Sequence, residues 1–462
     1  MMVLLVSCSN SQSNPSAEPE VSLSEVNEFD GEDGVLRIAM VQPSSTEPAD
    51  LVLTDQAQVI LSDLLHDGLT EVEANSGNLR PGLATSWSAN EDFTAWTFQL
   101  DPNRLDAEQV KASFERQGNQ RSAVVRELMS IISSIEVISE FELRFDLVRP
   151  AAGFAWLTSG PGMAVTTEGD DLSGRLQVVS EDTNGMVLAS PEGLSDIDIR
   201  WTDSELEAQA LLESDEVDIA VSGDGGSQGQ ALGHVRFVVI NSASESLAGP
   251  TSRATINSIL SSVDVPEITS ANSTVDIDGL SSPALAGSSS LLCDQECNTG
   301  SGTPSQPVGE LTLKLGVSSD LYLPLAEVIR NAFTDSNITI EVVQAEPEDL
   351  ARRVSAGEID MLLFGWVAGA ASVDAVVPSL IRSDSPGNIF QLRDADIDRL
   401  LSEAALVGDD QRRWGLIAEA ESLAISSDVV VPLGALSSKV RTNEDAASMA
   451  IRADGTLDTF RY

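Results

Sequence analysis

The stretch from residue 311 to 364, LTLKLGVSSDLYLPLAEVIRNAFTDSNITIEVVQAEPEDLARRVSAGEIDMLLF, decides the fold class. Three short runs rich in β-branched and aliphatic residues alternate with two segments whose apolar residues have helical spacing. The runs cover 311–317, 338–343 and 359–364, and the helical segments cover 323–333 and 347–354. Strands that alternate with helices in this way predict a parallel sheet with covering helices, and hence an α/β fold.

An earlier part of the chain has the same organisation. Residues 197–201 and 217–221 are predicted strands on either side of a helix over 204–212. Within each half, the segments LESDEVDIA (212–220) and VSAGEIDML (354–362) both run from a helix end through a tight turn into a strand. We therefore expect two α/β lobes, with a ligand cleft between them beyond the carboxyl ends of the strands.

The remaining periodic segments complete the predicted elements. Further strands are expected at 35–40, 93–100, 131–137, 142–147 and 429–433, and further helices at 59–69, 107–117, 395–405 and 412–425. Asp106 is the expected N-cap of the helix over 107–117. Residues 269–307 are rich in Ser, Gly, Ala and Thr, and we interpret them as a solvated loop; a partly ordered insertion is the alternative.

The charge balance is strongly acidic. The 462 residues include 73 Asp and Glu against 26 Lys and Arg, a formal net charge of −47. Such a surface repels nucleic-acid phosphates and anionic lipid head groups, so we expect no nucleic-acid partner. The hydrophobic content of 42% is enough for a large core, which argues against a disordered chain.

The N-terminal residues resemble a lipoprotein signal. Leu5-Val6-Ser7-Cys8 is similar to a bacterial lipobox, in which the cysteine becomes lipidated, and we interpret residues 1–8 as a truncated signal segment. The first basic residue is Arg37, so the positive region of a complete signal peptide would lie upstream. Residues 9–34 are polar and acidic, as a flexible tether would be. An incidental cysteine in a frayed terminus is the alternative.

The other two cysteines lie close together in a Ser/Gly-rich stretch. Cys293 and Cys297 suit a small-loop disulfide in an oxidising compartment. Zinc is the alternative, but the only histidines, His66 and His234, are distant in the sequence. We therefore expect no metal and no cofactor.

Several motifs occur in an order that resembles the family 5 solute-binding proteins of ABC transporters, the peptide/nickel type. They are Pro81-Gly-Leu-Ala-Thr-Ser-Trp87, the strand at 93–100, Ala107-Glu-Gln-Val-Lys-Ala-Ser-Phe-Glu-Arg116, Glu216-Val-Asp-Ile-Ala220, Phe364-Gly-Trp366, and the segments at 396–404 and 431–433. The likeness extends over most of residues 35–462, and the colinear order of the motifs carries it.

The resemblance implies a two-lobed fold like that of periplasmic binding proteins (type II, cluster C) with an extra inserted domain. By analogy, domain I comprises 35–65, 180–242 and 432–462, domain II is the insert at 66–179, and domain III covers 243–431. It also implies a monomeric extracytoplasmic lipoprotein, held to the cell membrane by its lipid anchor. Its partners would be a small peptide-like solute and the permease and ATPase subunits of the importer.

The resemblance also implies a ligand site after the strand that ends near Trp366. In peptide-binding members an aspartate three residues after this tryptophan pairs with the α-ammonium of the peptide. Gly369 occupies that position here, and Asp374 is the nearest carboxylate that could replace it. Trp366, Gly369 and Asp374 are therefore the predicted ligand-binding residues, although Trp366 could equally be a core indole.

No motif predicts catalysis. The sequence contains no Gly-x-Ser-x-Gly elbow and no Walker-type phosphate loop, so we predict that the protein is not an enzyme. Two alternatives stay open: a lipid-anchored sensor or surface protein that keeps the binding fold without transport, and, less favoured, a periplasmic hydrolase that uses two carboxylates.

Overall fold

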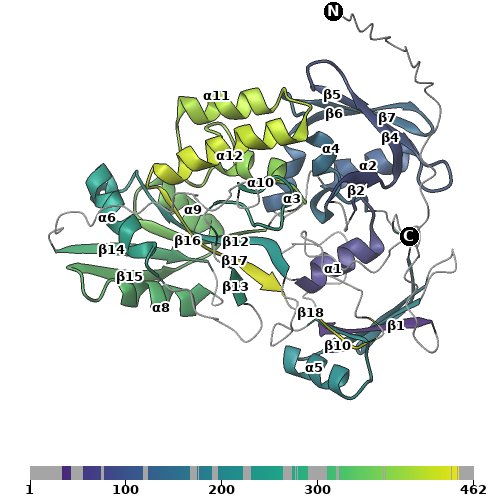
Figure 1. The fold of residues 1–462 in the computed structure, drawn as a ribbon, viewed down its shortest axis with the longest axis horizontal. Helices are drawn as coiled ribbons and strands as arrows, with labels where there is room; N and C mark the ends of the chain where they lie inside the picture. Colours follow the sequence, from purple (N-terminus) through teal and green to yellow (C-terminus); the bar gives the residue numbers. More distant parts are fainter. Residues whose placement is uncertain are drawn as a thin grey trace, which may run out of the picture.

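The structure is a computed structural model of the chain. It describes residues 34–42, 56–73, 77–117, 123–166, 174, 176–189, 196–221, 230–263, 273–275, 277, 279–289, 310–318, 322–367, 369, 371–438, 440–444 and 446. Figure 1 shows two sheets that lie apart from one another, with a third, smaller sheet above the first. The α/β class predicted from the alternating strands and helices is confirmed.

The first sheet is built around the strand predicted near the start of the chain. Its six strands, in spatial order, are β18 (Val440–Thr442), β11 (Ile219–Val221), β1 (Val35–Val41), β10 (Asp196–Thr202), β9 (Gly185–Ala189) and β8 (Gln177–Asp182). β1 pairs in parallel with both β10 and β11, as the alternating pattern predicts. Two helices accompany this sheet, α1 (Gln56–Leu65) and α5 (Glu205–Glu213).

The second sheet contains the stretch that decides the fold. Its order is β13 (Ser273–Val275), β17 (Val430–Ser438), β12 (Gln230–Ile240), β16 (Met361–Val367), β14 (Leu311–Val317) and β15 (Ile338–Gln344). β14 pairs in parallel with β15 and β16, whereas β12 runs antiparallel to its neighbours. The helices of this part are α6 (Pro250–Leu260), α8 (Leu323–Ala332), α9 (Pro347–Ser355), α10 (Val373–Ile381), α11 (Ala395–Ala404) and α12 (Asp410–Ser426).

The chain crosses between the two large sheets at two places that the structure describes on both sides. β11 belongs to the first sheet and the next strand, β12, to the second; β17 and β18 are separated by one residue and lie in different sheets. The domain limits stay a prediction, but the sheets differ from them in three places. Residues 230–240 of β12 and 432–438 of β17, predicted in domain I, lie in the second sheet. Residues 177–179, predicted in domain II, belong to β8 of the first sheet.

The part of the chain between β1 and β8, which are both in the first sheet, forms a separate small sheet. Its strands, in order, are β4 (Ala84–Ala89), β5 (Ala95–Leu100), β7 (Glu142–Leu147) and β6 (Ile132–Ser139), accompanied by the hairpin of β2 (Thr70–Val72) and β3 (Leu79–Pro81). The helices are α2 (Ala107–Gln117), α3 (Ala123–Met129), α4 (Phe154–Leu157) and the short η2 (Pro161–Met163). Asp106 caps α2 as predicted, because its carboxylate accepts a bond from the Gln109 N–H at 2.8 Å.

The two matching turns seen in the sequence perform the same structural task in both lobes. Asp218 accepts a hydrogen bond from the backbone N–H of Arg37 on β1, and Asp360 accepts one from that of Lys314 on β14, both at 2.8 Å. Three residues earlier the backbone turns left-handed, at Asp215 (φ 57°) and Gly357 (φ 72°). The two aspartates therefore fasten neighbouring parallel strands together.

The interpretation of residues 269–307 as a solvated loop is wrong for the described segment 279–289. Leu280 and Leu285 have no exposed side-chain surface, and Ser281 is also buried. The reason is a carboxylate on α12: Glu421 accepts hydrogen bonds from the backbone N–H groups of residues 280 and 281. Composition alone indicated a loop because small polar residues are also common at the surface.

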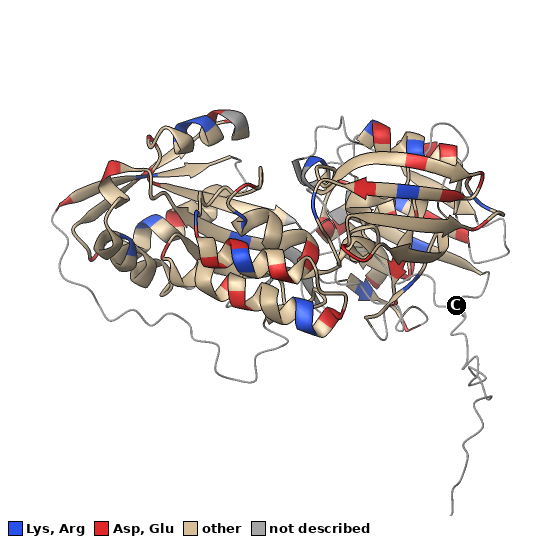
Figure 2. Ribbon diagram, turned by 90° about the horizontal axis from the view of Figure 1, so that it is seen from above, with Lys and Arg blue, Asp and Glu red and all other residues tan. Residues whose placement is uncertain are grey.

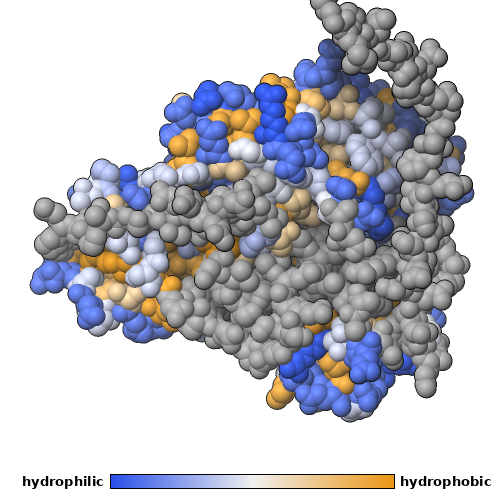
Figure 3. Space-filling model, viewed as in Figure 1, coloured by the Kyte–Doolittle hydropathy of each residue, from blue (hydrophilic) through white to orange (hydrophobic). Residues whose placement is uncertain are grey.

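Charged residues are spread over the described surface. Figure 2 shows acidic and basic positions interspersed along the described ribbon. Figure 3 shows mainly hydrophilic side chains on one face, interrupted by apolar patches. Among the helices that the structure describes, none has the length and apolar character that crossing a bilayer requires.

One buried side chain predicts a pH-dependent stability. Burial lowers the pKa of His66, which follows α1, to about 4 from an ordinary value of 6.5. Below pH 6.5 the unfolded chain takes up a proton that the folded chain does not. Stability present above pH 6.5 is therefore lost as the pH falls towards 4, by up to roughly 3 kcal/mol from this group.

The check is urea denaturation of the wild type and of His66→Gln at pH 7, 6, 5 and 4.5. Other groups titrate in both proteins, so the difference between their free energies of unfolding isolates the histidine. We expect the variant to lose less stability on acidification than the wild type. Equal losses in the two proteins would contradict a neutral buried histidine.

Candidate functional site

The three predicted ligand-binding residues follow one another at the end of β16, but they face different surroundings. Trp366 is the last but one residue of β16, Gly369 lies in the following loop, and Asp374 is in the first turn of α10. Only Asp374 lines the cavity described below. Their role in binding a ligand therefore stays a prediction.

Trp366 is packed in the core that the second sheet shares with the insert. Its side chain is 6% exposed and its ring centroid lies 6.3 Å from that of Phe364, on the same face of the strand. The indole N–H has no hydrogen-bond partner among the described residues. A buried donor without a partner costs about 1–3 kcal/mol, so this group is one that a ligand oxygen could satisfy.

Gly369 fastens the loop after β16 to the insert. Its carbonyl oxygen accepts a hydrogen bond from the backbone N–H of Gly162 at 2.8 Å. The approach is close because Gly162 has no side chain: a Cβ there would lie 2.6 Å from a methyl carbon of Leu128 and 2.8 Å from the Gly369 oxygen. The loop is therefore held in place by backbone contact.

Asp374 is the acceptor of a buried ion pair. Its carboxylate accepts from the Arg413 Nε at 2.7 Å and Nη2 at 3.1 Å, and from the Trp414 indole N–H at 2.8 Å. Arg413 is 1% exposed. Burial alone would lower the pKa of Arg413, but the charges of Asp374 and Asp410 more than offset it and the pKa is raised. The Ser372 hydroxyl donates to the same carboxylate at 2.8 Å, so a ligand ammonium would compete with three donor residues.

Sequence reasoning missed a more available charged residue. Arg236 lies on β12, in an otherwise apolar run, and its guanidinium carbon is 5.8 Å from the centre of the Tyr322 ring. Its Nε has no hydrogen-bond partner, and no carboxylate among the described residues pairs with it. Burial lowers the pKa of Arg236 and raises the pKa of Tyr322. A single charged residue within an apolar predicted strand is the sequence feature that could have identified Arg236.

The position of this pair agrees with the general rule for α/β sheets. Arg236 lies opposite Gly365, near the carboxyl end of β16, and Tyr322 follows the carboxyl end of β14, directly before α8. Ligands of open α/β sheets bind beyond the carboxyl ends of the strands. Arg236 and Tyr322 therefore form the candidate site, whereas Trp366 lies on the opposite face of the sheet.

The described residues contain no metal centre. No group of three or more His, Cys, Asp or Glu side chains among them could hold a metal ion. Cys8, Cys293 and Cys297, the predicted lipidation site and disulfide, lie outside the described residues.

Comparisons with known proteins agree with the predicted resemblance. Residues 78–184 match the model of the bacterial extracellular solute-binding proteins, family 5 Middle. The Di/tripeptide-binding protein 3 of Pseudomonas aeruginosa (strain UCBPP-PA14) is 28% identical over 111 residues, which are 24% of this chain and only 21% of that relative.

The fold extends the likeness over most of the chain. The periplasmic binding protein DppA from Helicobacter pylori, an ABC transporter-associated protein in complex with the peptide STSA, matches with a TM-score of 0.67 and 17% identity over 91% of this chain and 96% of that one. The clavulanic acid biosynthesis oligopeptide binding protein 2 matches with a TM-score of 0.72 and 15% identity over 92% and 94%. The predicted resemblance to family 5 and the two-lobed binding-protein fold are confirmed.

Proposed function

We propose that this chain is the solute-binding subunit of an ABC importer. In this proposal it captures a peptide-like solute between its two lobes and delivers it to a permease driven by an ATPase. It acts on the extracytoplasmic side of the cell membrane, where Cys8 carries the lipid anchor. The proposal is supported by the family match of residues 78–184 and by the peptide-binding proteins that share the fold.

The observation that carries the proposal is the pair of chain crossings between the two large sheets. β11 and β12 follow one another in the chain but lie in different sheets, and so do β17 and β18. Two lobes joined by such crossings can close around a solute, and a solute that contacts both would shift the population towards the closed state. This arrangement suits capture and release of a solute.

Arg236 suggests which end of the solute is recognised. The guanidinium is partly buried without a carboxylate among the described residues, and Arg binds carboxylates with two parallel hydrogen bonds. Gly369 has no carboxylate to pair with a ligand ammonium, and the carboxylate of Asp374 already accepts hydrogen bonds from Arg413 and Trp414. We therefore propose that the solute is bound chiefly through a carboxylate, such as the C-terminus of a short peptide.

The test is a thermal-shift screen of the purified chain against di- to pentapeptides, nickel chelates, oligosaccharides and compatible solutes. A ligand that binds only the native state must raise the melting temperature. We expect a hit among the peptides, at least about tenfold weaker binding of the same peptide amidated at its C-terminus, and a similar loss in Arg236→Gln. The hit should also reduce the radius of gyration in small-angle scattering.

Arg330→Gln, a change of an exposed arginine on α8 in the same lobe, is the matched control and should bind the peptide normally. Equal binding of the free and amidated peptides would exclude recognition through the carboxylate. A hit confined to another class of solute would exclude the peptide proposal. An uptake defect on deletion of the gene would distinguish an importer from a sensor or surface protein.

A further inference from the structure

A cavity lies between the insert and the helices of the second lobe, and neither Arg236 nor Tyr322 lines it. Its volume is about 70 Å³, and its walls are largely apolar. The insert contributes the end of α3 and the segment before α4, and the second lobe contributes α10, α11 and α12. The apolar wall includes Leu128, Ile131, Leu157, Leu401 and Ile417.

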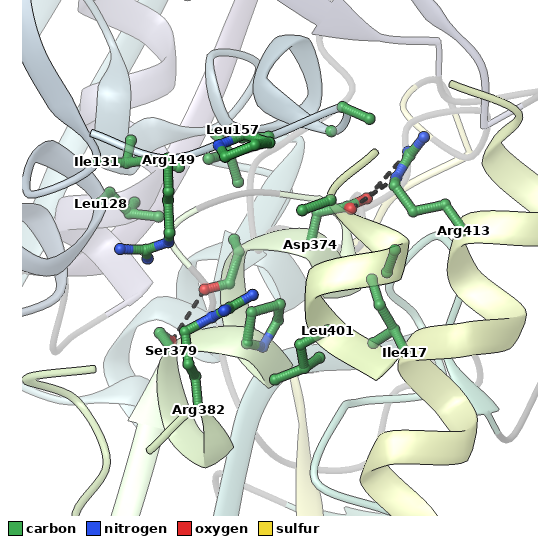
Figure 4. A pocket seen from close by; sticks show the side chains of 18 residues that line it. Leu128, Ile131, Arg149, Leu157, Asp374, Ser379, Arg382, Leu401, Arg413 and Ile417 are labelled. Carbon is green, nitrogen blue, oxygen red and sulfur yellow. Dashed lines mark hydrogen bonds and ion pairs between the residues drawn. The ribbon is translucent and has the colours of Figure 1, made fainter. Parts of the chain in front are cut away.

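Two arginines from different parts of the chain enter this cavity. Figure 4 shows Arg149, from the insert, and Arg382, which follows α10, reaching in from opposite sides. Arg149 has no ion pair or hydrogen bond with any residue that the structure describes. Arg382 donates one long hydrogen bond to the Ser402 hydroxyl at 3.4 Å, and its Nε is buried without a partner.

The charges around the two arginines leave a surplus of positive charge inside the cavity. Burial and the neighbouring Arg149 both lower the pKa of Arg382, whereas Asp384 and Asp398 raise it. Neither of these aspartates lines the cavity. The carboxylate that does line it, Asp374, is already paired with Arg413 (Figure 4).

This arrangement is unusual for the composition of the chain. With 73 acidic and 26 basic residues, most arginines can find a carboxylate, yet these two face the same space without one between them. Two like charges that line one partly buried cavity repel each other unless an anion lies between them. The apolar wall beside them would accommodate a short hydrocarbon chain but would not suit a fully hydrated inorganic ion.

We propose that this cavity binds a small organic monocarboxylate, with its carboxylate between Arg149 and Arg382 and its apolar chain against Leu128 and Leu401. The site is separate from the one proposed for the transported solute. Because one arginine belongs to the insert and the other to the second lobe, the bound anion links these two parts of the molecule.

Calorimetric titration of the full chain with butyrate tests the proposal, with butyramide as the neutral analogue of the same shape, both at fixed ionic strength. We expect butyrate to bind and butyramide to bind at least about tenfold more weakly, because charge-assisted hydrogen bonds are lost. Arg149→Gln and Arg382→Gln should each weaken butyrate binding by at least about tenfold. Arg352→Gln, at an exposed arginine on α9, should leave it unchanged.

Several results would overturn the proposal. They are an absence of butyrate binding, equal binding of butyramide, undiminished binding in both glutamine variants, or tighter binding of inorganic phosphate than of butyrate. If a glutamine variant fails to fold, the lysine variant at that position keeps the charge but loses the planar fork. It is expected to bind butyrate more weakly than the wild type, and unchanged affinity would equally count against the site.

Discussion

Asp374→Ala is expected to lower the free energy of unfolding by about 3–5 kcal/mol, the largest stability effect we predict. The substitution leaves the guanidinium of Arg413 buried without its bidentate partner, and it also removes the acceptor of the Trp414 indole N–H. The measurement is urea denaturation followed by tryptophan fluorescence. Asp374→Asn, which keeps an acceptor oxygen but no charge, should have an intermediate effect.

The same arginine provides a matched control. Asp410 also pairs with Arg413, at 2.6 Å, but its side chain is 43% exposed. An ion pair with an exposed partner is worth at most about 1 kcal/mol, so Asp410→Ala should cost much less than Asp374→Ala. Equal costs for the two substitutions would contradict a structural anchor at Asp374. A small cost together with lost peptide binding would instead favour the predicted role of Asp374 in the ligand site.

Glu421→Ala is expected to lower the free energy of unfolding by about 2–4 kcal/mol. The Glu421 carboxylate is buried and accepts from the backbone N–H groups of Leu280 and Ser281 and from the Ser281 hydroxyl. Alanine would leave these donors buried without an acceptor, and the segment 279–289 would lose its attachment to α12. The loss can be measured by urea denaturation, and faster proteolysis within the segment should accompany it.

Glu421→Gln is the control, and its effect depends on pH. Burial raises the pKa of Glu421 above its unfolded value, so stability is full below the unfolded pKa and is lost as the pH rises through the folded pKa. Glutamine keeps an acceptor and carries no charge. The variant should therefore gain stability relative to the wild type as the pH rises above the unfolded pKa of the carboxyl group. A parallel pH dependence of the two proteins would contradict a carboxyl group with a raised pKa.

The secondary structure and its pairing could largely be predicted from the sequence. Strands β1, β10, β14 and β15 lie where the two-residue hydrophobic period and the β-branched residues predict them. β1 pairs in parallel with β10, and β14 with β15, as the alternation of strands with helices predicts. The likeness of the turns before Asp218 and Asp360 also proved structural, since both carboxylates fasten parallel strands. These features depend on residues close together in the chain, where local spacing carries the information.

The candidate sites could be predicted only in part. The sequence indicated the loop after β16 through Trp366, Gly369 and Asp374, but not that Asp374 is paired with Arg413, 39 residues later. It contained a signal at Arg236, a lone charge in an apolar run, but did not show that this arginine lacks a carboxylate partner, and it offered no reason to place Arg149 beside Arg382.

The sequence by itself therefore determined the α/β class, the order of the elements and the resemblance to a binding-protein family. The tertiary structure alone decided which charged side chains are neutralised and which remain available. The physical reason is that hydrophobic periodicity is a local property, so each segment shows which face it buries. The partner of a buried charge is set by how distant segments pack, and in a chain with 73 acidic residues the sequence offers many partners without showing which one is near.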